Sequence, residues 1–166
     1  MKQLVIVAHN LRSAHNVGSL LRTAEGLGVQ IILTGYTPYP LLAADNRLPH
    51  LAHKIHNQIH KTALDAESQP IWQRQESITD AISQLKAEGF TVLALEQTAA
   101  ALPLPELVLP EKLALIVGRE VEGVEPEVLA VCDGAVVIPM FGRKESFNVV
   151  QAAAMAMYHW RFVDKQ

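Results

Sequence analysis

Short apolar runs that alternate with helical patterns dominate this sequence. The runs are continuous in their apolarity and rich in branched residues, which is typical of strands that are covered on both faces. They predict strands at residues 4–7, 29–33, 90–95, 113–117 and 135–138, with a weaker strand at Ile71. Because helices are expected between them, the pattern predicts an α/β fold with a mostly parallel sheet flanked by helices.

Capping residues mark where the helices are expected to begin. Asn16 can cap a helix that starts at Val17, because a side-chain oxygen at a cap accepts a hydrogen bond from a free backbone amide. Ser77 with Asp80 resembles a capping box, and Gly89 can end the helix that follows.

The last helix is expected to run from about Ser146 to Phe162, and it is apolar nearly all round. A helix at the end of a small domain seldom buries every face within its own chain, so we expect a subunit interface there. A central helix inside a single core is the alternative. The stretch 36–49 is expected to be a long functional loop and the stretch 99–110 a connection, and Pro126 can start another helix.

Length and composition indicate the class of protein. The 166 residues fit one domain, and 49% hydrophobic with 19% charged residues is too apolar for a disordered chain. The single cysteine, Cys132, cannot form an internal disulfide and suits a reducing compartment. No apolar run resembles a signal peptide or a membrane span, so we expect a soluble cytoplasmic protein.

The net charge of −3 is unevenly spread along the chain. Residues 1–64 carry six Lys or Arg against two acidic residues, a balance of +4, whereas residues 65–166 carry eight against fifteen, a balance of −7. Six of the seven histidines also lie in the basic part. This asymmetry permits local nucleic-acid binding despite the acidic total. An uneven but solvated surface explains the charges equally well.

Two common nucleotide-binding signatures fail on inspection. Gly26 and Gly28 lack the third glycine of a dinucleotide fingerprint, and Gly118 and Gly123 have the spacing of a phosphate loop without its lysine. Four glutamates between residues 120 and 127 would repel phosphate. They could instead accept hydrogen bonds from ribose hydroxyls or from a cationic ligand.

Three other segments are more informative together than apart. Segment 10–28 has an apolar helical stripe with Arg22 off the stripe. Segment 113–127 is a buried strand that breaks into a glycine turn, where open parallel sheets bind ligands. Segment 136–158 joins a strand to a helix start that carries Ser146 and Asn148. Taken singly, a solvated arginine or a helix cap at Ser146 beside an exposed Asn148 explains these residues.

In this order the three segments resemble the SpoU family of SPOUT-class RNA methyltransferases, over nearly the whole chain. The first motif is carried by Asn10, Arg12, Ser13, Asn16, Gly18, Arg22, Thr23 and Ala24, the second by Gly118, Glu120 and Gly123, and the third by Ile138, Pro139, Met140, Gly142, Ser146, Asn148 and Val149. Arg119, Phe147 and Val150 depart from the usual family residues. The chain looks like a minimal member, a single domain over residues 1–166.

The resemblance implies a carboxy-terminal trefoil knot and a homodimer whose active sites combine two subunits. It also implies methyl transfer from S-adenosylmethionine to a ribose 2'-hydroxyl of tRNA or rRNA. The cofactor-binding residues would be Leu95, Glu96, Val117, Gly118, Ile138, Pro139, Met140 and Ser146.

The resemblance further assigns catalysis to Arg22, Asn16, Glu120, Ser146 and Asn148. Since an arginine almost never gives up its proton, we expect Arg22 to polarise the hydroxyl together with a target phosphate. Glu120 would orient Arg22 or Asn16. The competing function is a knotted RNA-binding or assembly module without catalysis, but the presence of all five residues favours the enzyme.

Cations and histidines of the basic part complete the candidates. Arg12, Arg47, Lys54 and Lys61 are the residues we expect to contact RNA phosphates. Histidines 50, 53, 56 and 60 would share one side of a helix. No cysteine or nearby carboxylate completes a set of ligands around them, so no metal site is predicted. Contact with RNA phosphates and a plain exposed face are the two alternatives for these histidines.

Overall fold

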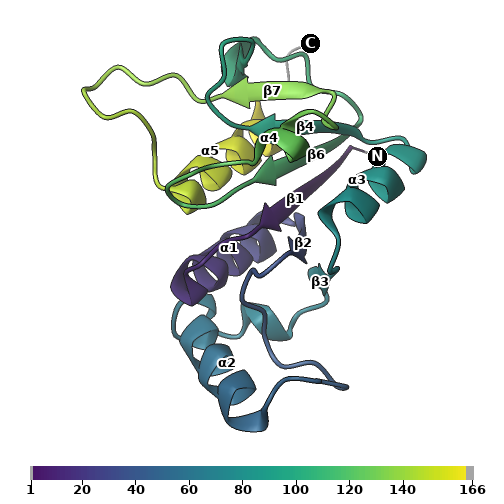
Figure 1. Ribbon diagram of the computed structural model, residues 1–166. Coiled ribbons are helices and arrows are strands. Elements are labelled where there is room, and N and C mark those ends of the chain that lie inside the picture. Colours follow the sequence, from purple (N-terminus) through teal and green to yellow (C-terminus); the bar gives the residue numbers. More distant parts are fainter. Residues whose placement is uncertain (1, 164–166) are drawn as a thin grey trace.

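Strands and helices alternate along the chain, as the apolar pattern predicts. The structure is a computed structural model that describes residues 2–163 (Figure 1). The strands are β1 (Gln3–His9), β2 (Gln30–Thr34), β3 (Trp72–Arg74), β4 (Thr91–Leu95), β5 (Leu102–Pro103), β6 (Lys112–Val117) and β7 (Gly134–Val137). The helices are α1 (Ala14–Leu27), α2 (Pro49–Ala63), α3 (Ile78–Ala87), α4 (Pro126–Leu129) and α5 (Val149–Phe162), with 3-10 turns at Ala66–Ser68 and Leu104–Glu106.

The strands of the described chain form one seven-stranded sheet in the order β3-β2-β1-β6-β4-β7-β5. Every neighbouring pair is parallel. At the centre, β1 and β6 pair from Gln3 opposite Lys112 to Ala8 opposite Val117. The α/β fold with a mostly parallel sheet is therefore confirmed, while the trefoil knot stays a prediction.

Helices cover both faces of the sheet. Ile6 and Leu115 belong to the core cluster that includes α1 and α5, whereas Val7 and Ile116 belong to the cluster that includes α3 and α4. Neighbouring residues of one strand thus face opposite cores, which explains why the apolar runs are continuous. Within residues 2–163, no helix is both long and apolar enough to cross a membrane.

Two helix starts differ from the prediction. The Ser13 side chain accepts from the Asn16 amide at 3.2 Å, so Ser13 caps α1 and Asn16 lies inside its first turn. At α5 the Asn148 side-chain oxygen accepts from the Val150 amide at 2.9 Å, and the helix begins later than Ser146. The side chains of Asn16 and Ser146 therefore do not cap these two helices and can form other contacts.

Other boundaries follow the sequence signals closely. The Ser77 side chain accepts from the Asp80 amide at 3.1 Å, so the predicted cap of α3 is confirmed. Gly89 follows the helix with a φ of 85°, a conformation that favours glycine. Strand β5 was missed within the stretch expected to be a connection, because two residues show no periodicity.

Candidate functional site

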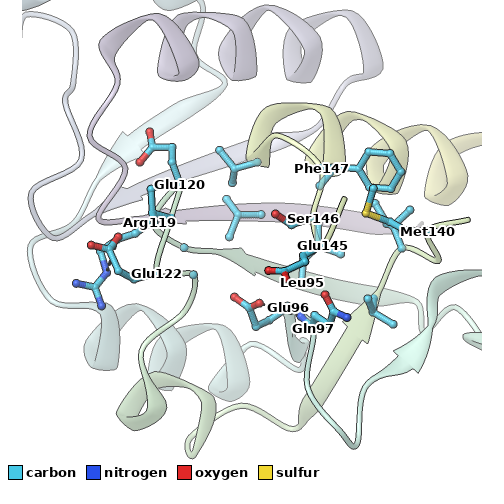
Figure 2. Close-up of a pocket in the computed structure, with 18 residues that line it drawn as sticks. Leu95, Glu96, Gln97, Arg119, Glu120, Glu122, Met140, Glu145, Ser146 and Phe147 are labelled. Atoms are coloured by element: carbon cyan, nitrogen blue, oxygen red, sulfur yellow. Dashed lines mark hydrogen bonds and ion pairs between the residues drawn. The ribbon is translucent and has the colours of Figure 1, made fainter. Parts of the chain in front are cut away.

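A pocket of about 300 Å³ lies at the carboxyl ends of β4, β6 and β7. Parallel strands end at one edge of a sheet, and open α/β sheets bind ligands there. The volume lies at the lower end of the range for small-molecule sites, roughly 300–1,000 Å³. Figure 2 shows Arg119, Glu120 and Glu122 on one side of the pocket, with Glu145 and Ser146 beside Leu95–Gln97 on the other.

The pocket collects most of the residues predicted to bind a cofactor. Those that line it are Leu95, Glu96, Val117, Gly118, Ile138, Met140 and Ser146. Pro139 lies along the chain between two of them. The three strand ends that the resemblance assigned to cofactor binding therefore meet in space.

Glu96 fixes the loop that follows β6. One oxygen of its carboxylate accepts from the Val124 amide and the other from the Gln97 amide, both at 2.9 Å. Gly123 has a φ of 73°, and a Cβ there would lie 2.1 Å from Glu96 Oε2. At Gly118 a Cβ would lie 2.4 Å from the Gly123 carbonyl. The two motif glycines are thus required by close packing within the loop.

Glu120 joins this loop to the start of α1. Its carboxylate accepts hydrogen bonds from the amides of Arg12 and Ser13 and from Asn16 Nδ2, at 3.0 to 3.2 Å. Burial by itself would raise the pKa of this carboxyl, but these donors outweigh it and hold the pKa below its usual value. A carboxylate at a helix N-terminus is also favoured by the helix dipole. Of the two side chains that Glu120 is predicted to orient, the hydrogen bond joins it to Asn16, and the orienting role itself stays a prediction.

A second polar cluster, which the sequence analysis missed, lies beside Glu120. Asn10, with a φ of 56°, donates from Nδ2 to Glu125 Oε1 at 2.7 Å. His9 Nε2 lies 3.6 Å from Glu125 Oε2, and its Nδ1 lies 2.9 Å from Thr34 Oγ1. Arg119 Nε lies 3.6 Å from Glu125 Oε1. The positions of His9 and Thr34 at the ends of predicted strands were the available signal.

Burial sets the charge of this cluster. Desolvation lowers the pKa of His9, against a raising effect of Glu125. Burial would raise the pKa of Glu125, but the hydrogen bond from Asn10 helps to hold it below its usual value. The cluster therefore contains a neutral imidazole and an ionised carboxylate at neutral pH.

The remaining catalytic candidates occupy different places. Ser146 lines the pocket, and Asn148 caps α5 two residues later. Arg22 is exposed and borders a hollow between α1 and α5 with Met155 and Tyr158. Six residues of helix separate Arg22 from Asn16 by about 9 Å along the axis and about 120° around it. Of the five catalytic candidates, Glu120 and Ser146 line this pocket, whereas Arg22, Asn16 and Asn148 do not.

The four candidates for RNA contact differ in whether their side chains already have hydrogen-bond or ion-pair partners within the chain. Arg47 donates to both oxygens of Asp45 and to the carbonyls of Tyr39 and Pro40, so it organises the loop before α2. Arg12 forms an exposed ion pair of 2.8 Å with Glu122. Exposed on α2 are Lys54 and Lys61.

Helix α2 itself packs closely on α1. At Gly18 of α1 a Cβ would lie 2.2 Å from the Ile59 carbonyl oxygen of α2. The glycine of the first motif therefore makes room for the helix that carries Lys54, Lys61 and four of the seven histidines.

The histidine region requires one correction. Two carboxylates lie near His60: Glu67 Oε1 is 2.5 Å and Asp65 Oδ1 3.7 Å from Nδ1. The expectation that no nearby carboxylate exists was wrong, because the chain turns back after α2. The hydrogen bond that His60 donates to the Glu67 carboxylate raises the pKa of His60. A short direct contact between histidine and carboxylate is the geometry of an ion pair, since ligands around one zinc ion stand farther apart.

Comparison with known proteins shows which family the chain belongs to. The sequence model of the SpoU rRNA Methylase family matches residues 3–158. The chain belongs to the SpoU rRNA Methylase family. The SpoU match contains all three motifs, including the segments that form the pocket.

Individual SpoU relatives agree with this assignment. A tRNA (guanosine(18)-2'-O)-methyltransferase of Mus musculus is 28% identical over 166 residues, which are 100% of this chain and 10% of that protein. The enzyme of the same name from Aquifex aeolicus is 26% identical over 160 residues, 95% of this chain and 68% of that protein. The chain thus spans only part of the length of these relatives.

The fold also agrees with a solved structure. The AdoMet-bound rRNA methyltransferase from Sinorhizobium meliloti superposes with a TM-score of 0.80 at 20% identity, covering 99% of this chain and 57% of that one.

Proposed function

We propose that this SpoU chain is an S-adenosylmethionine-dependent methyltransferase of the ribose 2'-hydroxyl in transfer or ribosomal RNA. The main support is the pocket in which the second and third motifs meet. Glu120, which lines it, accepts a hydrogen bond from Asn16 of the first motif. The two relatives are named as tRNA 2'-O-methyltransferases, and the Sinorhizobium meliloti protein as an AdoMet-bound rRNA methyltransferase.

The pocket suits a ligand that carries positive charge. Its charged lining residues are Glu96, Arg119, Glu120, Glu122 and Glu145. When bound, S-adenosylmethionine supplies a methyl group on a sulfonium sulfur. Glu145 and Ser146 would hold its charged end, and the apolar side chains of Leu95, Ile138 and Met140 its ring.

The protein's part is to align the ribose hydroxyl and to favour loss of its proton. Glu120 fixes Asn16 at the start of α1, where the amide side chain is half-buried. Arg22 stays charged at any working pH, so it acts by attracting a target phosphate and polarising the hydroxyl. The hydroxyl proton then leaves to solvent or to that phosphate as the methyl group is transferred.

A homodimer explains why Arg22 lies away from the pocket of its own chain. Beside Arg22, α5 exposes the large apolar side chains Met155, Tyr158 and Phe162, the last two by 59% and 61%. A second copy of the chain would cover this face in a self-complementary interface, since most homodimers are two-fold symmetric. Each Arg22 would then serve the pocket of the partner.

Mixing inactive chains tests this composite site. Arg22→Ala and Ser146→Ala should each be inactive alone. An equal mixture that reassorts at random should regain about a quarter of wild-type activity, because half of its dimers are mixed and each of these keeps one of its two sites intact. Sedimentation should show a dimer at micromolar concentration. An active monomer, or a mixture without any recovery, would refute the composite site.

Labelling of RNA tests the reaction itself. Total RNA from cells lacking the protein would be incubated with it and radiolabelled S-adenosylmethionine, and ribose methylation would then be mapped. Label at a defined ribose supports the enzyme and names its target. RNA binding without any transfer would support the competing binding module.

A further inference from the structure

The connection between β7 and α5 carries an aromatic side chain that the fold does not use. Residues 141–148 are all exposed, and Phe141 is exposed by 100%. Figure 1 shows this connection extending from the sheet as a long loop. A phenylalanine ring has a large apolar surface, and here none of it is buried within the described chain.

Both ends of the loop lie at the pocket. Met140, just before Phe141, lines the pocket, and so do Glu145–Phe147 after the loop. Residues 141–144 therefore join two segments that line the pocket, whose open side is called its mouth below. If the chain methylates RNA as proposed above, the target ribose must enter through this mouth, and its neighbouring nucleotides come within reach of the loop.

Two cations stand beside Phe141. Arg143 and Lys144 are exposed, and neither forms an ion pair within residues 2–163. Most charged residues lining the pocket are glutamates, so these two cations are a local source of attraction for phosphate. An aromatic face beside free cations is the arrangement with which proteins bind unpaired nucleotides.

We propose that Phe141 stacks on an unpaired base next to the target nucleotide, while Arg143 and Lys144 contact the flanking phosphates. Loop 141–144 is then a binding site for single-stranded RNA that holds the target strand over the pocket. Stacking tolerates any base, because every base has a flat face. The loop therefore supplies affinity and position, and leaves the choice of sequence to other contacts.

The test measures RNA binding separately from methylation. The probe is a mixed-sequence 12-nucleotide single-stranded RNA without cofactor. Phe141→Ala should weaken its binding by about 5- to 150-fold, and Phe141→Tyr should restore most of it. Val108→Ala is the matched control, since Val108 is an apolar side chain exposed by 84% in the segment before β6.

Charge and stacking give two further readouts. Changing Arg143 and Lys144 together to Gln should reduce the slope of log affinity against log salt concentration by about 1.4, which is roughly 0.7 for each lost phosphate contact. In Phe141→Trp, the RNA should quench the tryptophan fluorescence that remains after the wild-type signal of Trp72 and Trp160 has been subtracted.

The outcomes separate this inference from the proposed reaction. If the wild type methylates RNA but Phe141→Ala binds the 12-mer normally, the loop inference is overturned and the reaction stands. If RNA binding depends on Phe141 but no methyl group is transferred to RNA, the proposed reaction is overturned and RNA binding by loop 141–144 is supported. If the wild type sediments as a dimer and Phe141→Ala as a monomer, the loop is a subunit contact and the inference is overturned.

Discussion

Removing the charge of Glu120 should test how the site is held together. The Glu120→Gln variant keeps the shape and one acceptor oxygen, but its NH2 group faces the Arg12 amide at the Oε2 position, or the donors of Arg12, Ser13 and Asn16 at the Oε1 position. A hydrogen bond to a charged group contributes roughly 1.5–3 kcal/mol and a charge at a helix terminus about 0.3–1 kcal/mol. Since one acceptor remains, we expect a loss of about 1–3 kcal/mol in the free energy of unfolding at pH 7.

The pH dependence of this loss has a definite sign. The folded-state pKa of Glu120 lies below its ordinary value of 4.5. Its stabilising contribution is therefore fully present above the unfolded pKa and is lost as pH falls through the folded pKa. The stability difference between the wild type and Glu120→Gln should stay constant from pH 7 to about pH 5.5 and shrink below pH 4.5.

Urea denaturation at fixed protein concentration measures both effects. Glu76→Gln, which changes an exposed carboxylate before α3, is the control and should stay within about 0.5 kcal/mol of the wild type. A double-mutant cycle with Asn16→Ala should give a coupling of about 0.5–3 kcal/mol. Equal stability of the wild type and Glu120→Gln at pH 7, or a difference that persists unchanged at pH 3.5, would refute the reasoning.

Other residues give simpler tests. Arg22→Ala should change stability by about 0.5 kcal/mol at most but slow single-turnover methylation roughly 100- to 10,000-fold with cofactor binding intact; a near-normal rate would exclude Arg22 from catalysis. Changing Lys54 and Lys61 to Ala should flatten the salt dependence of RNA binding by about one unit per lost contact, and an unchanged slope contradicts this. Burial raises the pKa of Cys132 to about 11, so iodoacetamide at pH 8 should label it slowly until urea unfolds the chain.

Much of the fold could be predicted because it depends on burial along single elements. Continuous apolar runs located the longer strands, since each of these is covered on both faces. Local caps were less certain: Ser13 and Asn16 are both good caps, and only the packed structure decides between them. Strand β5 escaped because its pairing with β7 is set by tertiary contact.

The candidate site could be predicted in part. The resemblance located the pocket residues, but spacing along the chain does not give the distance of Arg22 from Ser146. The His9–Glu125 contact joins residues at opposite ends of the sequence and depends on the backbone turn at Asn10. Contacts of this kind arise between loops, where neither periodicity nor capping carries information.

The acidic residues of the site show why composition alone misleads here. The carboxylates near the second motif suggested a surface that repels phosphate or attracts a cation. Yet Glu96 and Glu120 each turn inward to accept backbone amides, and these bonds fix the loop after β6 and the start of α1. A carboxylate that is already satisfied by amides offers a ligand fewer free acceptors. Exposed groups such as Glu145 would therefore interact most with the charge of a ligand, while the half-buried Glu96 and Glu120 set the shape of the pocket.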